Sequence, residues 1–460
     1  MYHFCANEGD HHSSGNAPFS SAAAEANDLD ALIFEFGTSR CKFGYAGEDF
    51  PRVYERPIPY PAAQDVEDLS LNRAAAQTES DPEKLAQWLF DASSSKLQTR
   101  LSDHPLLLVE RPFTLPEEVT GNGKQDEQDG KKDAAVASSS GKKRDLKARE
   151  KMVEVVMEEL GVPALFCAKS AVLACYANAR TSGLVVEMGA TYTSVTSVHE
   201  GYAFAYPKSQ VTLFGGHDLD AFLRQKLAPQ VAKNREQVAA SSVEKEIAKR
   251  RQQTWSYVVE AKESGLCRVA DGPFDESQNA QLPLINYELP DKTVVAMGTE
   301  RFSVAEHYFL GETAQSNASE VQDANVAAND GPGMRLPELI CETGGLTTET
   351  ELRKELFQNI VLTGGSSCFE NMPTRIEREV VTTLSGMPLP LTGSGSVGGG
   401  NGGFASSLRV KVVATHTQER RVGSFLGGSI LASLGSFHEM WMSKAEYAEH
   451  GAALIHKKCP

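Results

Sequence analysis

Three short apolar segments, each ending in glycine followed by small or hydroxyl residues, place the strongest constraint on how this chain can fold. They begin at Ile33, Val186 and Ile360 and read IFEFGTSRCK, VEMGATYT and IVLTGGSS. An apolar run that ends at glycine is typical of a buried strand entering a tight turn. Glycine lets backbone amides approach a phosphate oxygen, and hydroxyl groups add further donors.

Two of these junctions also carry an acid two residues before the glycine, Glu35 and Glu187. Such a pair can hold a hydrated divalent cation between two hairpins. Any one strand–glycine junction is usually only a turn, but two acid-bearing copies and a Gly-Gly third favour a phosphate clamp between two lobes. The chain contains no GxxxxGK[ST], and GxGxxG occurs only within the glycine-rich tract 393–407, away from any strand pattern, so the ordinary P-loop and Rossmann sites are not expected.

Strand patterns alternate with helical patterns along the chain, which predicts an α/β fold. Strands are expected at 31–36, 105–109, 184–187 and 360–362. Helices are expected where apolar residues recur at helical spacing, namely at Leu85, Trp88 and Leu89 and at Val153, Val156, Met157 and Leu160. The charged stretch 219–262 is predicted to be helical and solvent-facing.

Four polar or low-complexity tracts interrupt this pattern. We expect a disordered tail at 1–27, a disordered insert at 120–144, a polar loop insert at 312–342 and a glycine-rich insert at 393–407. Their composition cannot bury a core, so they are predicted to lie outside the folded body.

Bulk composition narrows the function. With 61 acidic and 45 basic residues among 460, the net charge is −16, which disfavours a protein that mainly grips phosphate backbones and favours basic partners such as histones. The eight cysteines form no CxxC pair, so neither disulfides nor structural zinc are expected. We find no secretory signal and no stretch of membrane-spanning length, which predicts a cytosolic or nuclear protein.

Four long blocks, in the same order, resemble the actin family. They are FGTSRCKFGYAGEDFPRV, HPLLLVERP with the stretch REKMVEVV…GATYTSV, IVLTGGSSCFENMPTRIEREV, and RRVGSFLGG…HKKCP at the carboxyl end. The resemblance implies an actin-like two-lobed ATPase fold, shared with sugar kinases and heat-shock chaperones, around a central nucleotide cleft. It implies a first lobe at 28–180 with a reduced outer subdomain at about 53–103, a second lobe at 181–415, and a segment at 416–460 that returns to the first lobe.

The resemblance also implies ATP as the ligand, with Mg²⁺ or Ca²⁺ held through water by Glu35 and Glu187. The residues that match phosphate contacts in the family are Gly37, Thr38, Ser39, Lys42, Gly189, Ala190 and Thr191. Those that match the adenosine and base contacts are Gly364, Gly365, Ser366, Phe369, Lys262, Glu263 and Arg421. For Lys262 and Arg421 the alternative is a solvated surface charge.

Several positions depart from the family pattern. Glu35 and Glu187 stand where actins carry aspartate, and Ala190 replaces an aspartate. Ser170 replaces the glutamine that orients the attacking water, and its shorter hydroxyl cannot span the same gap. We therefore expect an ATP binder with little or no ATPase activity.

The segment between Arg52 and Trp88 is shorter than in actins and has no recognisable DNase-binding loop, so filament growth is not expected. Together with the carboxyl end, this resembles the fourth nuclear actin-related subfamily, whose members are scaffold subunits of chromatin-remodelling and histone acetyltransferase complexes. The resemblance implies a nuclear location, with the cytoplasm as a second compartment.

The implied partners are a helix of the remodeller ATPase, actin or another actin-related protein, and histones, with no sequence-specific nucleic acid and no membrane. The matching docking positions are Tyr176, Tyr202, Ile430, Leu431 and Leu434; for Ile430 and Leu431 a place in the core is the alternative. The main rival function is a divergent cytoskeletal actin that polymerises and hydrolyses ATP. A sugar or metabolite kinase would need a catalytic acid in a substrate pocket, and no candidate stands out.

Overall fold

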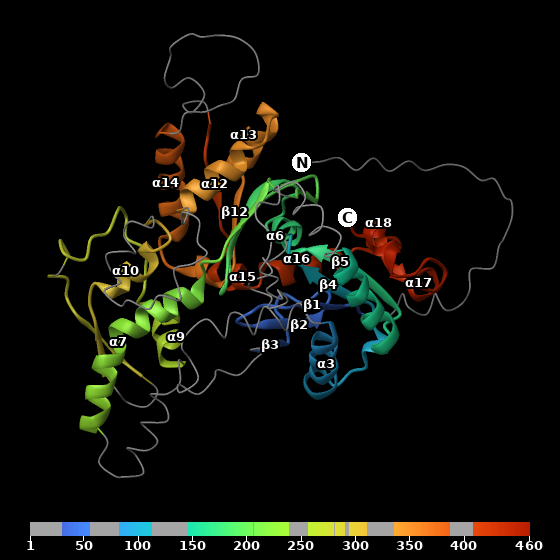
Figure 1. Cartoon of the computed structure of the whole chain (residues 1–460), viewed down its shortest axis with the longest axis horizontal. Coiled ribbons are helices and arrows are strands. Elements are labelled where there is room, and N and C mark those ends of the chain that lie inside the picture. The colour runs from blue at the N-terminus through green and yellow to red at the C-terminus, as the bar shows by residue number, and fades with distance from the viewer. Residues whose placement is uncertain are drawn as a thin grey trace, which may run out of the picture.

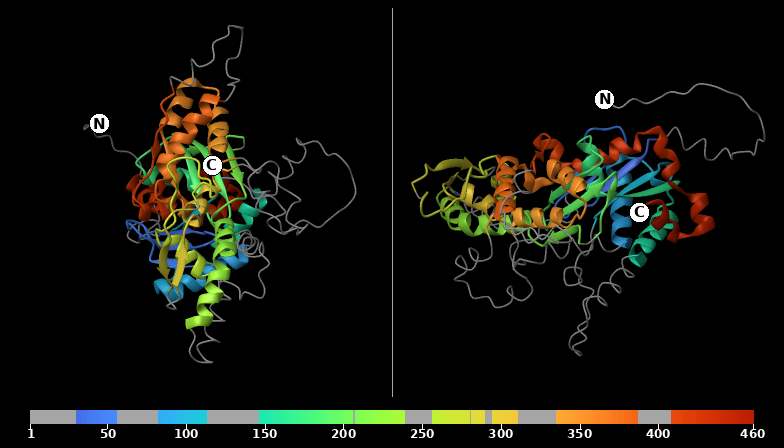
Figure 2. Two further views of the ribbon diagram at one scale, coloured as in Figure 1. Left: turned by 90° about the vertical axis from the view of Figure 1, so that its left-hand side faces the viewer. Right: turned by 90° about the horizontal axis from the view of Figure 1, so that it is seen from above.

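The computed structural model of the protein describes residues 30–55, 82–112, 146–205, 207–238, 256–279, 281–289, 294–310, 335–386 and 408–460. Two six-stranded sheets form the centres of two lobes (Figure 1). Seen from above in Figure 2, the yellow part of the second lobe and the red carboxy-terminal helices lie at opposite ends of the molecule.

The first sheet has the strand order β14-β5-β4-β1-β2-β3. Its strands are β1 (Leu32–Glu35), β2 (Cys41–Tyr45), β3 (Val53–Glu55), β4 (Leu106–Glu110), β5 (Ala164–Lys169) and β14 (Met442–Ser443). β1, β4 and β5 run parallel, whereas β2, β3 and β14 are antiparallel to their neighbours. The last strand, β14, thus brings the carboxy-terminal segment back onto the first sheet.

The second sheet has the order β13-β12-β6-β7-β8, with β9 also paired to β7. Its strands are β6 (Gly183–Met188), β7 (Thr193–His199), β8 (Tyr202–Ala203), β9 (Ser209–Thr212), β12 (Ile360–Thr363) and β13 (Val412–Val413). β10 (Ile285–Glu288) and β11 (Val294–Met297) form a separate two-stranded sheet. The parallel pair β6 and β12 ends at the same edge of the sheet, which brings two of the three glycine junctions together.

The α-helices are α3 (Pro82–Ala92), α6 (Ser170–Ala177), α7 (Gly216–Val238), α9 (Ser256–Glu263), α10 (Glu300–Glu306), α12 (Leu336–Gly345), α13 (Thr350–Gln358), α14 (Met372–Gly386), α15 (Thr417–Arg421), α16 (Gly423–Ala432), α17 (Lys444–His450) and α18 (Ile455–Lys458). The π-helical turns are η3 (Ser93–Leu97) and η5 (Val155–Glu159), and the 3₁₀ turns are η4 (Leu101–Asp103), η6 (Gly365–Cys368), η8 (Gly435–Met440) and η9 (Ala452–Leu454). Residues 146–154 are also helical and run into η5.

Helices α6 and α16 pack against each other between the two sheets (Figure 1). Leu173 of α6 and Phe425 of α16 are buried in the core of the first lobe. On another side of α6, Ala171 and Cys175 pack with Val185 and Val361 of the second sheet. The two helices therefore connect the cores of the two lobes.

The predicted strands and amphipathic helices are confirmed: β1, β4, β6 and β12 lie where the pattern placed them, and Leu85, Leu89, Val153, Val156 and Met157 are buried. The polar loop predicted at 312–342 is wrong at its end, because α12 begins at Leu336 and buries Leu339 and Ile340. Residues 312–334 of that loop, the tail at 1–27 and the inserts at 120–144 and 393–407 lie outside the described residues.

The prediction that 219–262 faces solvent is also wrong for the described part. Helices α7 and α9 bury Leu219, Leu223 and Val258 in the core of the second lobe. The charged side chains of Asp220 and Lys262 are also mostly buried, as an ion pair between the two helices. Seven cysteines in the described ranges carry free thiols. No helix in those ranges is both long and apolar enough to cross a membrane.

Candidate functional site: a cleft between the two lobes

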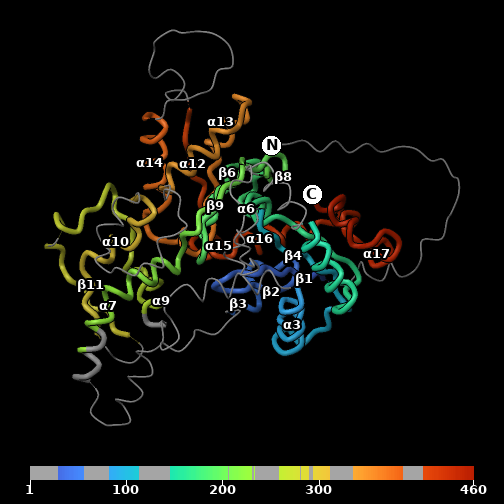
Figure 3. The backbone as a smooth tube through the Cα atoms, viewed as in Figure 1, coloured from blue at the N-terminus to red at the C-terminus, as the bar shows by residue number. Residues whose placement is uncertain are grey.

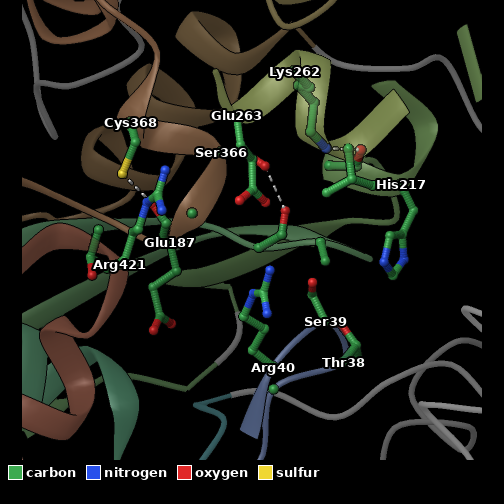
Figure 4. A pocket seen from close by; sticks show the side chains of 18 of the residues that line it. Thr38, Ser39, Arg40, Glu187, His217, Lys262, Glu263, Ser366, Cys368 and Arg421 are labelled. Atoms are coloured by element: carbon green, nitrogen blue, oxygen red, sulfur yellow. Dashed lines mark hydrogen bonds between the residues drawn. The ribbon is translucent and has the colours of Figure 1, made fainter. Parts of the chain in front are cut away.

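A cavity of about 420 Å³ lies where the three glycine junctions meet (Figure 4). It is lined by residues of both lobes, and every predicted nucleotide-binding residue except Thr191 lies on its wall: Gly37, Thr38, Ser39, Lys42, Gly189, Ala190, Lys262, Glu263, Gly364, Gly365, Ser366, Phe369 and Arg421. Residues from Glu35 to Ser424, far apart in the chain, are thus gathered around one space.

The first junction is the hairpin β1–β2. Glu35 and Lys42 face each other across the hairpin and form an ion pair. Burial opposes the charged form of Lys42, but the pairing with Glu35 outweighs it and raises the pKa of the ammonium group. The second carboxylate oxygen of Glu35, Oε2, is buried and has no hydrogen-bond partner among the described residues. An acceptor in that state needs a cation or a donor that the protein itself does not supply.

The second junction is the hairpin β6–β7, in which Glu187 occupies the corresponding place. Its Oε2 accepts hydrogen bonds from Ser170 Oγ at 3.0 Å and Ser194 Oγ at 3.3 Å. Burial raises the pKa of Glu187 from 4.5 to about 7, and the charge of Glu35 adds to the rise while the two hydroxyl donors oppose it. Glu187 therefore exchanges a proton near neutral pH.

The two carboxylates fit a hydrated divalent cation. Both Glu35 and Glu187 line the cavity, and Glu35 Oε2 is an oxygen left over for a ligand. Mg²⁺ usually keeps several waters and needs only one or two carboxylates together with phosphate oxygens. The described residues contain no group of three or more His, Cys, Asp or Glu that would make a fully protein-built metal site.

Ser170 begins helix α6 and is not part of the cavity wall. Its hydroxyl is 3.0 Å from Glu187, to which it donates, and the residue is only 8% exposed. The hydroxyl is therefore engaged by the protein and does not face the space in which a water could be oriented.

Thr191 is the one predicted phosphate-contacting residue that does not line the cavity. It is buried, and its Oγ1 donates to Thr38 Oγ1 at a distance of 2.8 Å. Thr38 lies on the cavity wall, so Thr191 reaches the cavity only through Thr38.

The third junction is held by a glycine that no other residue can replace. Gly364 has a φ of +94°, and a Cβ placed on it would lie 2.4 Å from the carbonyl oxygen of Met188. Beyond it, Ser366 Oγ donates to the carbonyl of Gly189 at 3.1 Å, which ties the third junction to the second.

Lys262 and Arg421 are two basic residues of the cavity wall. Lys262 Nζ lies 2.6 Å from Asp220 Oδ1 and donates to the carbonyl of Gly216 at 2.8 Å. Arg421 is half-buried; burial opposes its charge, but interactions with Cys368 and Glu263 raise its pKa. The alternative of a solvated surface charge is therefore wrong for both residues.

Sequence reasoning missed Arg40, His217, Asp220 and Cys368, which also line the cavity. His217 lies at the start of α7, where its amide donates to the carbonyl of Ala190 at 2.8 Å. The Gly-Gly-His-Asp sequence before an apolar helix is a helix-start signal that could have pointed to it. Nothing local marks Asp220, because its partner Lys262 is distant in sequence.

The five predicted docking residues divide into two groups. Tyr202, Ile430 and Leu434 are 64%, 41% and 49% exposed, whereas Tyr176 and Leu431 are half-buried and pack against the core of the first lobe. The core alternative is therefore wrong for Ile430 and holds in part for Leu431. Helix α6, which carries Tyr176, contacts both α16 and β8 (Figure 3).

Comparison with known proteins agrees with this architecture. The family model described as Actin matches residues 139–460. Actin-related protein 4 of Arabidopsis thaliana is 30% identical, with 94% of this chain and 99% of the relative covered. Actin-related protein 4 of Oryza sativa, in both subspecies indica and japonica, is 28% identical with the same coverage. This chain belongs to the actin family and, within it, is an actin-related protein similar to actin-related protein 4.

Proposed function

We propose that this chain is a non-polymerising, ATP-binding scaffold subunit of a nuclear chromatin-remodelling or histone acetyltransferase complex. The main observation in support of ATP binding is that three glycine junctions, from both lobes, meet at one cavity. In the proposed complex Thr38, Ser39 and Lys42 hold the phosphates together with the backbone at Gly189. Glu263 and Arg421 hold the base end.

A divalent cation at Glu35 and Glu187 would supply positive charge to the phosphates. The orphaned Glu35 Oε2 supports this assignment. Bound nucleotide then bridges the lobes and stabilises the closed protein by mass action.

Hydrolysis is expected to be very slow, because the usual orienting side chain is missing. Ser170 donates to Glu187 and lies outside the cavity wall, and Ala190 offers no functional group. Without the glutamine side chain of the family pattern, the orientation of the attacking water is lost. A steady-state phosphate-release assay is expected to give turnover far below that of actin, and actin-like turnover would refute this part of the proposal.

The scaffold part is supported by the exposed apolar residues Tyr202, Ile430 and Leu434, which suit the apolar face of a partner helix. The net charge of −16 suits basic partners such as histones. The resemblance of the chain to a nuclear actin-related subfamily supports a remodeller ATPase as the source of the partner helix, and actin or another actin-related protein as neighbours in the complex.

Two measurements test the scaffold proposal. Sedimentation in salt that polymerises actin is expected to show a monomer. Titration with a helical peptide from a remodeller ATPase is expected to show binding that Leu434→Asp weakens about tenfold or more. The matched control is Leu284→Asp, because Leu284 is 69% exposed but lies in the second lobe beside β10. Filaments, or equal binding by both variants, would favour a cytoskeletal actin or another docking face.

A further inference from the structure

Two hydroxyl groups join the tips of the first and second hairpins across the cleft. Thr38 lies in the turn between β1 and β2 of the first sheet, and Thr191 lies in the turn between β6 and β7 of the second. Thr191 Oγ1 donates to Thr38 Oγ1 at 2.8 Å, although the residues are 153 positions apart. This hydrogen bond therefore connects one lobe directly to the other.

Each hairpin tip is fixed to its own lobe. In the second hairpin, the carbonyls of Gly189 and Ala190 accept from the amides of Gly216 and His217 at 3.0 and 2.8 Å. In the first, the ion pair of Glu35 with Lys42 joins the two strands beside the turn. Because each tip moves with its own lobe, opening of the cleft must break the hydrogen bond between Thr191 and Thr38, which we call the hydroxyl bridge.

A second contact crosses the cleft at the same end. The guanidinium of Arg111, just beyond β4, lies over the ring of Tyr192 with 5.9 Å between Cζ and the ring centroid. Both contacts join the same two hairpin regions, so both resist separation of the lobes at this end of the cleft.

The direction of the bridge also matters for the cavity. Thr191 is the donor, so the hydroxyl proton of Thr38 remains available to an acceptor. Thr38 lines the cavity and Thr191 does not. A hydroxyl that already accepts one hydrogen bond is a better donor for the next.

We propose that Thr191 is a positioning residue that closes the phosphate end of the cleft and turns Thr38 into a donor toward a bound phosphate. The closing part rests on protein–protein contacts alone, whereas the donor part rests on the proposed nucleotide binding. Loss of the bridge shifts the lobes toward the open form and speeds the release of nucleotide.

Three variants isolate the hydroxyl of Thr191. Thr191→Val keeps the branched shape and removes the hydroxyl, and Thr191→Ser keeps the hydroxyl. Thr196→Val is the matched control, because Thr196 Oγ1 shares a buried hydrogen bond of 2.9 Å with Ser209 Oγ inside the second lobe. All three can lose some stability, but only Thr191→Val removes the link between the lobes.

The first measurement is hydrogen exchange of the peptides 34–43 and 186–195 in nucleotide-free protein, which reports the opening equilibrium. The second is the dissociation rate of an ATP analogue with a fluorescent ribose. One neutral hydrogen bond changes an equilibrium by roughly two- to tenfold. We expect both rates to rise by about that factor in Thr191→Val and to stay within about twofold of wild type in Thr191→Ser and Thr196→Val.

Wild-type rates in Thr191→Val, or an equal rise in Thr196→Val, would overturn the proposal. If the wild-type protein does not bind the analogue, the proposed nucleotide function fails. Hydrogen exchange then tests only the closing role of the hydroxyl bridge. Faster exchange in Thr191→Val supports that role, and unchanged exchange rejects it.

Discussion

The hairpins β1–β2 and β6–β7 each place a glutamate two residues before a glycine, but the residue across the hairpin differs. Glu35 faces Lys42, and Glu187 faces Ser194. The first carboxylate is balanced by a full positive charge, whereas the second receives only hydroxyl hydrogen bonds and has a pKa of about 7. The strand–glycine pattern thus determines where each carboxylate lies, whereas the raised pKa of Glu187 comes first from burial, which its hydroxyl donors only partly offset.

The two carboxylates therefore differ in how each can bind a cation in the cleft. In the first hairpin Glu35 pairs with Lys42, and its second oxygen, Oε2, has no hydrogen-bond partner among the described residues. The second hairpin supplies a carboxyl that must lose its proton before it can take part. We therefore expect cation binding to the protein to be accompanied by proton release.

Removal of the positive charge of Lys42 from the first hairpin should have the largest effect on the stability of the protein. Lys42→Met removes the partner of the mostly buried Glu35, which should lower the free energy of unfolding by about 2–4 kcal/mol, less than for a fully enclosed ion pair because both side chains keep some exposure. Urea denaturation measures the change. The double variant Glu35→Gln/Lys42→Met should recover most of the loss, and a single variant as stable as wild type would show that the ion pair is not needed.

Glu187 of the second hairpin should make the stability of the protein depend on pH. Glu187 titrates near 7 when folded and near 4.5 when unfolded, so between these values the folded state holds the extra proton. Its contribution to stability is complete below pH 4.5 and is lost as the pH rises to about 7. Over this window wild type should lose roughly 2–3 kcal/mol relative to Glu187→Gln, as measured by denaturation with a chelator present. Parallel stability curves for the two proteins would contradict the assignment.

The two turns can be compared through their glycines. A Cβ on Gly37 would lie 2.4 Å from the carbonyl oxygen of Arg40, and one on Gly189 would lie 2.9 Å from that of Tyr192. Alanine at either position should destabilise the protein by about 1–3 kcal/mol, with the larger effect at Gly37. Thermal unfolding of Gly365→Ala is the control, because no atom lies within 4 Å of the added carbon. Equal stability of all three variants would mean that both turns can relax.

The sequence predicts the strands and glycine turns because their causes are local: apolar runs, glycine and hydroxyl residues lie side by side in the chain. Even the facing residues follow from hairpin geometry. Glu35 and Lys42 are equally distant from the turn at Thr38 and Ser39, so their pairing could have been predicted before a phosphate contact was assigned to Lys42.

Pairs that form across the fold carry no such signal. Thr38 with Thr191 and Lys262 with Asp220 meet only after the lobes have assembled. The polar loop predicted at 312–342 failed for a different reason. Leu336, Leu339 and Ile340 recur at helical spacing, but the polar residues before them masked the start of α12.

The smallest expected effect concerns the hydroxyl donors of the second hairpin. Ser170 donates to Glu187 at 3.0 Å and Ser194 at 3.3 Å, and both bonds favour the charged carboxylate. Ser170→Ala should therefore lower stability at pH 8 by about 0.5–1.5 kcal/mol and leave stability at pH 4 nearly unchanged, since the protonated carboxyl depends less on that donor.

Denaturation curves at the two pH values measure this difference. Ser194→Ala is the matched variant and should show the same pattern with a smaller loss, because its hydrogen bond is longer. An equal loss at both pH values would mean that Ser170 acts through packing at the start of α6. In that case the contrast between the hairpins would rest on Lys42 alone, and the hydroxyl groups around Glu187 would have no part in setting its charge.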